Sequence, residues 1–317
     1  MYQIKRWYLM LTGKSVWHVN QDIGKCFAKG EVRGYYNNMT EKVMKIPELL
    51  DSDELPKLNL EGGKFTYFPV AIFQYGLGCY DLYLQTKDKR YDCKFMQCVE
   101  WTLVQQDDEG RWNNFSHYCP NTPYGAMAQG EGASLLVRAY IHTHDQQYLD
   151  AAKKAIDFML LPLEDGGTTK YEGDDVFLME YTFKGVVMNG FIFAWWGLYD
   201  YVLATGDKGK YKEALERTQN TLINILPQFE NSYWSMYSFD GLIASPFYHN
   251  LHMAQMQAMY QLTGEFILMS TPRDGHASRK ILSAKGWHLL RNQFRRYWNN
   301  NEGSFSFKSE TECFGSW

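Results

Sequence analysis

From residue 69 onward, apolar residues recur every three or four positions, which is the spacing of a buried face on an α-helix. Few stretches show the sustained alternation that is typical of a β-strand. Helices are therefore the expected filling of the fold, with ends accurate to about 2 to 4 residues. The pattern predicts eight of them, at 69–86, 90–106, 123–143, 147–161, 185–205, 209–227, 246–263 and 276–297.

Short polar joints separate the two helices of most successive pairs, for example "TKDKR", "THDQQ" and "ATGDKGK". Joints of this length favour antiparallel helical hairpins. Between the pairs lie longer loops rich in glycine and aromatic residues, such as "QDDEGRWNNF" and "FENSYWSMYSFDG". Repetition of a hairpin and a loop places every long loop on the same side of a curved stack. We therefore predict an all-α fold, an incomplete α/α toroid of about four antiparallel helical hairpins, with short β-hairpin-like loops on the face that holds the site.

Residues 1–66 are mixed and poorly periodic, with turn signals at "KGEVRG" and "EGGKF". They are predicted to form an irregular N-terminal leader that packs on a main domain of residues 67–317. The apolar run "WYLML" is too short for the core of a signal peptide or for a membrane span. The six cysteines show no CxxC and no framework spacing, which favours reduced thiols and a cytoplasmic protein.

The composition adds a hint about the ligand. Aromatic residues make up 16% of the chain, with 23 Tyr and 10 Trp, and many lie in polar stretches. Aromatic faces beside hydrogen-bonding groups suit sugar rings. Trp112 and Trp234, in loops on the predicted site side, are the expected sugar platforms, whereas Trp195 and Trp196 are expected in a helix core. The net charge of −4 argues against nucleic acid, and an anionic substrate would need a local basic patch.

The stretch "SPFYHNLHMAQMQAMYQL" (245–262) has the pattern of a buried helix, but its first turn carries side chains that can ionise or transfer protons. Tyr248, His249 and His252 crowd one turn directly behind Pro246, a residue that suits the first turn of a helix. Two structural interpretations remain open. Tyr248 can be a core tyrosine whose hydroxyl bonds to a backbone carbonyl, and the two histidines can orient Tyr248. A metal site on the two histidines is disfavoured, because no carboxylate or cysteine accompanies them at ligand spacing.

Four stretches, taken together and in this order, resemble the C-terminal helical domain of D-glucuronyl C5-epimerases. The similarity covers most of residues 65–265. Members of that family convert glucuronate to iduronate within a polymer such as heparosan, without an organic cofactor. The resemblance thus implies an isomerase that acts on an anionic polysaccharide and needs no cofactor, and it leaves a homodimer open. The stretches are "FQYGLGCYDLYL" (73–84), "YGAMAQGEGASLLVRAY" (124–140), "MEYTFKGVVMNGFIFAWWGLYD" (179–200) and "YHNLHMAQMQ" (248–257).

The resemblance also implies roles for individual residues. The family's acidic and phenolic pair before the "NGF" helix matches Glu180 and Tyr181, its loop tyrosine matches Tyr237, and the tyrosine of its "YHxxH" matches Tyr248. In the family this last tyrosine faces C5 of the sugar, with the carboxylate on the other side. These four residues are the expected catalytic group. Substrate contacts are expected from Gln74, Tyr75, Trp112, Tyr124, Gln129, Glu131, Lys184, Asn189, Trp234, His249 and His252. For Gln129 and Glu131, the alternative that they satisfy buried backbone groups stays equally open.

The chemistry of epimerisation agrees with these residue types. A hydrogen must leave C5 and a proton must return on the opposite face, so two acid/base groups must flank one carbon. Glutamate, with a pKa of about 4.3, is a natural base, and tyrosine, at about 10, is a natural donor. Burial or neighbouring charge can bring the two values closer. Donors near the substrate carboxylate, such as Tyr181 or Tyr237, would stabilise the enediolate. Taken alone, Glu180 would be an ordinary acid at a helix N-terminus.

One departure from the family concerns the carboxylate anchor. Other members carry an arginine shortly after the loop tyrosine, in a "YDLRH"-like run, whereas this chain reads "YSFDG" (237–241). Lys184, Arg111 or Arg138 are candidates to replace it, although Arg138 lies in the middle of a helix, where it can hold a carboxylate of the scaffold.

Three rival functions stay open at this point. A polysaccharide lyase would use the same C5 carbanion to expel the C4 substituent. A glycosidase would pair Glu180 with Asp174 or Asp175, because α/α toroids can host paired carboxylates. A non-catalytic glycan-binding subunit would keep the cleft without turnover, and the missing arginine is the best argument for it.

Overall fold

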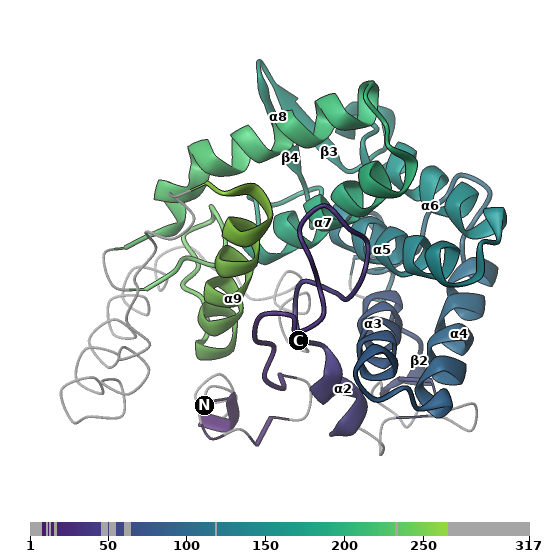
Figure 1. Ribbon diagram of the computed structural model, residues 1–317. Helices are drawn as coiled ribbons and strands as arrows, with labels where there is room; N and C mark the ends of the chain where they lie inside the picture. Colours follow the sequence, from purple (N-terminus) through teal and green to yellow (C-terminus); the bar gives the residue numbers. More distant parts are fainter. Residues whose placement is uncertain are drawn as a thin grey trace.

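The computed structural model describes residues 8–10, 12, 14–15, 18–45, 50, 55–59, 65–117, 119–231 and 234–265 of the 317-residue chain. The described part is an incomplete α/α toroid of antiparallel helical hairpins (Figure 1). Two short antiparallel pairs of strands accompany the helices. The elements are α2 (Thr40–Met44), β1 (Leu58–Asn59), β2 (Phe65–Thr66), α3 (Pro69–Thr86), α4 (Lys89–Val104), α5 (Ala126–Thr143), α6 (Gln146–Met159), β3 (Thr169–Glu172), β4 (Asp175–Leu178), α7 (Met188–Thr205), α8 (Lys210–Ile225) and α9 (Pro246–Thr263), with 3₁₀ turns at Leu163–Asp165 and Leu226–Phe229.

Each described hairpin turns at a joint of the same design, at residues 86–88, 143–145 and 205–207. The threonine that opens the joint donates its hydroxyl to the carbonyl four residues earlier. The middle residue adopts the left-handed conformation, with φ of 60°, 60° and 64°. The aspartate that closes the joint accepts a hydrogen bond from the amide two residues later, which begins the next helix. The hairpins are thus specified by three consecutive residues.

A similar turn follows α9, with Glu265 where the other joints have an aspartate. Thr263 donates to the carbonyl of Met259, and Gly264 has a φ of 85°. The helix predicted at 276–297 would come next, but it lies outside the described residues. Two of the helices that the structure describes, α3 and α9, have the bounds that the sequence pattern predicts, 69–86 and 246–263.

The helices form two rows with different burial. α3, α5 and α7 are buried along almost their whole length, whereas α4, α6 and α8 bury one face each. Glycines allow the inner helices to approach closely. A Cβ at Gly130 of α5 would overlap the backbone of Ala194 of α7, and one at Gly197 would overlap the carbonyl of Gly130. The inner row therefore forms the core of the toroid.

The segment at residues 18–45 crosses the centre of the ring, and α2 lies beside α3 (Figure 1). Its residues Tyr35, Tyr36 and Met39 are fully buried. The carbonyl of Gly34 accepts a hydrogen bond from Arg138 of α5 at 3.0 Å. This part of the predicted leader is therefore built into the core.

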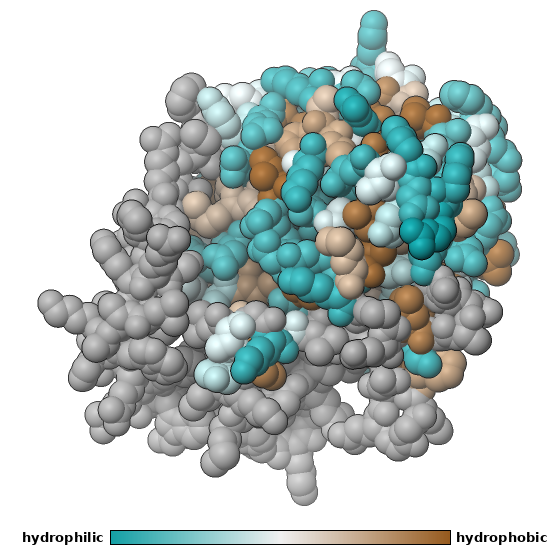
Figure 2. Space-filling view, turned by 60° about the horizontal axis from the view of Figure 1, so that its bottom comes forward, coloured by the Kyte–Doolittle hydropathy of each residue, from teal (hydrophilic) through white to brown (hydrophobic). Residues whose placement is uncertain are grey.

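Across the ranges that the structure describes, no helix has both the length and the apolar character needed to span a membrane. Hydrophilic and hydrophobic residues are interspersed on the described surface that Figure 2 turns forward.

Candidate active site

Because the short joints lie at one end of the hairpins, the long loops meet at the other end, where α5, α7 and α9 begin. Backbone hydrogen bonds tie these loops together. The amide of Ala126 donates to Met179 at 2.8 Å, and the amide of Met188 donates to Tyr237 at 3.2 Å. These bonds explain why α5 and α7 begin three residues later than the sequence pattern predicts. They also bring the loop before α7 next to the loop before α9.

Glu180 lies at the centre of this junction and is only 6% exposed. Its backbone packs against Gly125, and its carboxyl group packs against Gly190 in the first turn of α7. A Cβ at either glycine would overlap Glu180, so both glycines are needed for this close approach. Burial raises the pKa of Glu180 to about 7, although hydrogen bonding by Tyr181 and the charge of Lys184 oppose the rise.

Three tyrosines lie close to one another at this junction, and two of them, Tyr181 and Tyr237, interact with the carboxyl group of Glu180. The rings of Tyr237 and Tyr248 lie 4.8 Å apart between centroids. Burial raises the pKa of Tyr181 and Tyr237 well above the ordinary value, and the charge of Glu180 adds to the rise in both. Both phenols are therefore hydrogen-bond donors at neutral pH. The structure brings the four expected catalytic residues into one cluster.

His249 and His252 are buried behind this cluster and share one partner, Ser235. The Ser235 amide donates to Nδ1 of His249 at 3.2 Å, and the Ser235 hydroxyl lies 3.0 Å from the same nitrogen and 2.9 Å from Nδ1 of His252. Burial lowers the pKa of His249 to about 4 and that of His252 to about 3. Both rings are neutral at physiological pH, so they supply no positive charge to an enediolate. Their contacts with Ser235 hold the loop before α9 against that helix.

The two expected tryptophan platforms are not open to a sugar. Trp112 is fully buried and donates its indole N–H to the carbonyl of Thr102 at 2.8 Å. Trp234 is 6% exposed, donates to the carbonyl of Ala244 at 2.7 Å and stacks on His249. The prediction failed because a loop aromatic can fold back onto the scaffold when its polar atom finds a backbone partner.

An exposed ring that the sequence analysis missed lies at the rim of the cluster. Phe183 is 47% exposed, and its centroid lies 6.1 Å from that of Tyr181. The ammonium of Lys184 lies 5.1 Å from the Phe183 centroid and 5.2 Å from that of Tyr181. An aromatic residue between Tyr181 and Lys184 in a polar loop is the signal that could have identified it.

Several of the other expected contact residues lie in the interior. Gln74 donates its amide to both carboxyl oxygens of Glu131, at 2.9 and 3.2 Å. Glu131 and Gln129 are fully buried, and burial raises the pKa of Glu131 to about 8. Tyr75, at 2% exposure, belongs to the core. Asn189 is also buried, and its carbonyl accepts a hydrogen bond from Gln255 on α9.

The two arginines proposed as anchors have scaffold partners. Arg138 is fully buried and pairs with Asp200 at 2.6 Å. Arg111 pairs with Asp107 and Glu109 and lies 4.7 Å over the ring of Tyr124, which places Tyr124 in this scaffold contact.

At the family's arginine position the chain carries Asp240, which accepts a hydrogen bond from the amide of Gly185. Of the three candidate anchors, Lys184 is the one that interacts with Glu180.

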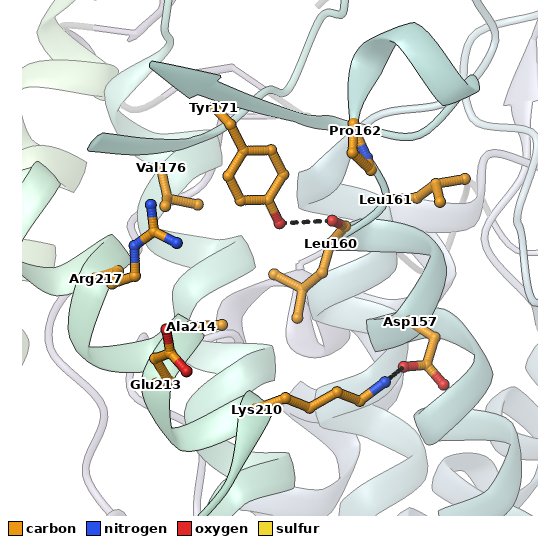
Figure 3. A pocket seen from close by; sticks show the side chains of 10 residues that line it. All are labelled: Asp157, Leu160, Leu161, Pro162, Tyr171, Val176, Lys210, Glu213, Ala214 and Arg217. Carbon is orange, nitrogen blue, oxygen red and sulfur yellow. Dashed lines mark hydrogen bonds and ion pairs between the residues drawn. The ribbon is translucent and has the colours of Figure 1, made fainter. Parts of the chain in front are cut away.

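A separate cavity of about 340 Å³ lies on the outer row, between α6, α8 and the β3–β4 hairpin (Figure 3). Of the two cations that line it, Lys210 is paired with Asp157 at 2.7 Å and Arg217 donates to the carbonyl of Gly173, and the hydroxyl of Tyr171 donates to the carbonyl of Leu160. None of the four expected catalytic residues lines it.

The fold and this junction define a helical toroid with a buried carboxyl group and three phenols where its long loops meet. Residues 105–273 match the family described as D-glucuronyl C5-epimerase C-terminus, which is more than half of the chain. The chain belongs to this family.

Two curated relatives differ in how much of them the chain spans. The D-glucuronyl C5-epimerase of Caenorhabditis elegans is 33% identical over 116 residues, which are 33% of this chain and 19% of that protein. An uncharacterized protein of Methanocaldococcus jannaschii is 29% identical over 221 residues, which are 60% of this chain and 70% of that protein. The chain thus spans about a fifth of the nematode enzyme.

Solved structures with a similar arrangement have low identity. One is an inactive variant of the α-1,6-mannanase of Salegentibacter sp. HEL1_6 in complex with α-1,6-mannotetrose, with a TM-score of 0.45, 17% identity, and coverage of 66% of this chain and 59% of that one. Another is a UGL variant with dGlcA-Glc-Rha-Glc, with a TM-score of 0.48, 12% identity, and coverage of 89% and 81%.

Proposed function

We propose that this protein is an isomerase that inverts C5 of uronic acid residues within a polysaccharide, converting D-glucuronate to L-iduronate in a heparosan-like polymer. Membership of the D-glucuronyl C5-epimerase C-terminus family supports this class of activity. The observation that carries the proposal is the buried Glu180, which interacts with Tyr181 and Tyr237, with Tyr248 packed against Tyr237. A single acid among three phenols suits proton transfer at one carbon.

In this mechanism Glu180 and Tyr248 act on opposite faces of C5. The carboxylate of Glu180 takes the C5 proton, and the electron pair of the C–H bond moves into the substrate carboxylate to form an enediolate. Tyr248 then donates its phenolic proton to C5 from the other face, and proton exchange with water restores both groups. A pKa of about 7 suits Glu180 to this role, because a base works best when its pKa lies near the working pH.

Neighbouring groups stabilise the charge that develops. Tyr181 and Tyr237 are protonated donors that can reach the enediolate oxygens, where hydrogen bonds strengthen as charge builds up. Lys184, at the rim beside Tyr181, supplies the positive charge that anchors the substrate carboxylate in place of the family's arginine. No cofactor takes part in these steps.

The carboxylates of the glycosidase alternative differ in environment. Asp174 is exposed at the turn between β3 and β4 and Asp175, the first residue of β4, is half-buried, whereas Glu180 is buried. This contrast favours a mechanism that rests on one carboxyl group and the phenols.

Incubation with unsulfated heparosan in deuterated water, followed by NMR of C5, tests the proposal. Deuterium at C5 together with iduronate signals is the expected result. An ultraviolet-absorbing unsaturated product would instead identify a lyase, and new reducing ends a glycosidase. Binding of heparosan without any exchange at C5 would identify a glycan-binding subunit.

A further inference from the structure

The cavity on the outer row is lined by both apolar and charged side chains (Figure 3). Apolar side chains come from the segment that follows α6, from β4 and from α8, and they are Leu160, Leu161, Pro162, Val176 and Ala214. The charged side chains come from α6 and α8. A volume of about 340 Å³ lies in the range of small-molecule sites. A ligand of this size would meet apolar and polar groups at the same time.

Tyr171 of β3 reaches over this cavity. It is 39% exposed, and its hydroxyl donates to the carbonyl of Leu160 at 2.7 Å. The guanidinium of Arg217 lies 5.9 Å from the centroid of the ring. Because the hydroxyl already has a backbone partner, the ring is held in place before any ligand binds. Its exposed surface is available to an apolar part of a ligand.

Three charged residues lie on one face of α8, at spacings of three and four, and line the cavity. Lys210 is paired with Asp157 at 2.7 Å. Within the ranges that the structure describes, the side chains of Glu213 and Arg217 form no ion pair, with each other or with another residue. Arg217 donates through Nη2 to the carbonyl of Gly173 at 3.2 Å. The cavity therefore offers a carboxylate acceptor and further guanidinium donors to a ligand.

This combination favours a saccharide over an anion. Two carboxylates and two cations line the cavity, so it has no excess positive charge to attract a polyanion. A sugar ring has an apolar C–H face and hydroxyl groups that both donate and accept, which suits an aromatic ring beside a donor and an acceptor. A uronate would bring its carboxylate close to Glu213. An uncharged sugar unit meets all of these conditions.

The backbone of β4 limits the distance between the cavity and the candidate active site. Val176 lines the cavity, and Glu180 follows it four residues later. Four residues span at most about 14 Å in a fully extended chain, so the two α-carbons lie within that distance. One polysaccharide of several sugar units is long enough to cover this separation.

We propose that this cavity is a second saccharide-binding site, which holds one uncharged sugar unit outside the active site. The sugar packs on Tyr171 and accepts and donates hydrogen bonds with Arg217 and Glu213. That this sugar belongs to the same polymer as the reacting uronate rests on the proposed function, whereas the chemistry of the cavity does not. The simpler alternative is a gap between helices that no sugar enters.

Calorimetric binding of an uncharged probe tests the proposal. The probe is a heparosan oligosaccharide of several disaccharides whose carboxyl groups are reduced to alcohols, so that it lacks the group that Lys184 would anchor. We expect Glu213→Met and Tyr171→Ala to weaken its binding by about tenfold or more. Tyr171→Phe keeps the ring and should retain most of the affinity. Glu216→Met is the matched control, because Glu216 is an exposed acid of the same helix, paired with Lys212 and outside the cavity, and it should behave as wild type.

Two results would overturn the inference. Unchanged affinity in Glu213→Met and Tyr171→Ala would place the sugar elsewhere on the protein, and equal losses in Glu213→Met and Glu216→Met would show that the cavity has no special role. Thermal unfolding of each variant identifies losses caused by misfolding. If Tyr171→Ala fails to fold, Glu213→Met decides alone, since the exposed Glu213 has no side-chain partner to lose among the described residues.

Binding needs no turnover, so the test separates this site from the epimerase proposal. Losses confined to Glu213→Met and Tyr171→Ala, in a protein that exchanges no deuterium at C5, would support the cavity site while the epimerase proposal fails. A wild type that epimerises heparosan but does not bind the reduced oligosaccharide would support the epimerase proposal and overturn the cavity site. A wild type that does neither contradicts both.

Discussion

The carboxyl group of Glu180 lies against the α-carbon of Gly190, in the first turn of α7. The acid comes from the loop that follows β4, so its position depends on a glycine in the "NGF" sequence ten residues later. This relationship gives a direct way to move the proposed base without changing its chemistry.

Gly190→Ala should displace Glu180, because the added methyl group would overlap Oε2 and Cβ of the glutamate. Overpacking of this kind costs about 1 to 3 kcal/mol in stability, and a misplaced catalytic group can lose about 10²-fold in rate. Chemical denaturation and the rate of deuterium incorporation at C5 measure the two effects. Gly209→Ala is the control, since a Cβ at that site would meet only a carboxyl oxygen of Asp207, at an ordinary contact distance of 3.8 Å, so the substitution should change the rate little. A Gly190→Ala protein with full activity would contradict the placement of Glu180.

Tyr248→Phe tests the second proton-transfer group. The substitution removes a hydroxyl and leaves the ring packed against Tyr237, so binding should survive. Conversion should fall by about 10² to 10⁴. The remaining base can still exchange deuterium into one epimer without inverting it. Glucuronate and iduronate substrates should therefore show opposite sensitivities in Tyr248→Phe and Glu180→Gln. Epimerisation by Tyr248→Phe at the wild-type rate would make Tyr248 structural.

The pH dependence follows from Glu180. Below a pH of about 7 its carboxyl group is mostly protonated and cannot accept the C5 proton. We expect kcat/KM to rise with pH up to about 7 and then level off, whereas an ordinary glutamate would place this limb near 4.3. Initial rates of exchange from pH 5 to 8 measure it. A rate that is constant down to pH 5 would exclude Glu180 as the base.

Lys184→Met should change both binding and this pH limb. Lys184 lowers the pKa of Glu180, so its removal should move the limb to higher pH. Affinity for the anionic polymer should also fall and depend less on salt, because exposed charges are screened over about 8 Å at physiological ionic strength. Lys208→Met, an exposed lysine at the opposite end of α7, is the control and should alter neither property. Unchanged affinity and pH limb in Lys184→Met would point to another anchor.

Glu131 gives a prediction for stability. Its pKa rises from 4.5 in the unfolded chain to about 8 when folded, so the folded state keeps a proton that the unfolded chain releases. Stability from this group is full below pH 4.5 and is lost as pH rises toward 8. Between pH 5 and 7, wild type should lose up to about 1.4 kcal/mol per pH unit relative to Glu131→Gln. Denaturant titrations at several pH values measure this difference, and the exposed Glu216→Gln should show none. A pH-independent difference would mean that Glu131 is ionised throughout.

Arg138→Met should destabilise the fold strongly and leave substrate recognition intact. The substitution would leave the buried Asp200 without its counter-ion, because the other partners of Asp200 are the hydroxyl groups of Tyr36 and Ser134. Breaking a buried pair costs about 3 to 5 kcal/mol, compared with about 0 to 1 for the exposed pair of Lys212 and Glu216. Urea unfolding compares the two. A selective loss of affinity in folded Arg138→Met protein would restore this arginine as an anchor.

The sequence by itself determined the helices between residues 69 and 263, the pairing of the first six of them and the order of the stretches that carry the site. Helix periodicity is local, and so is the joint that opens with threonine and closes with aspartate, because the two hydrogen bonds that define it span four and two residues. The expected catalytic residues could be named because their motifs resemble those of the D-glucuronyl C5-epimerase family. Repetition of the hairpins places the long loops that carry Glu180, Tyr181 and Tyr237 at one end of the toroid.

Only the tertiary structure decided which side chains face inward. Trp112 is buried because its indole and the backbone of Gly132 meet across the core, and Arg138 is buried because Asp200 lies on a neighbouring helix. Such contacts depend on how separate helices pack, and residue spacing along one segment does not record that packing.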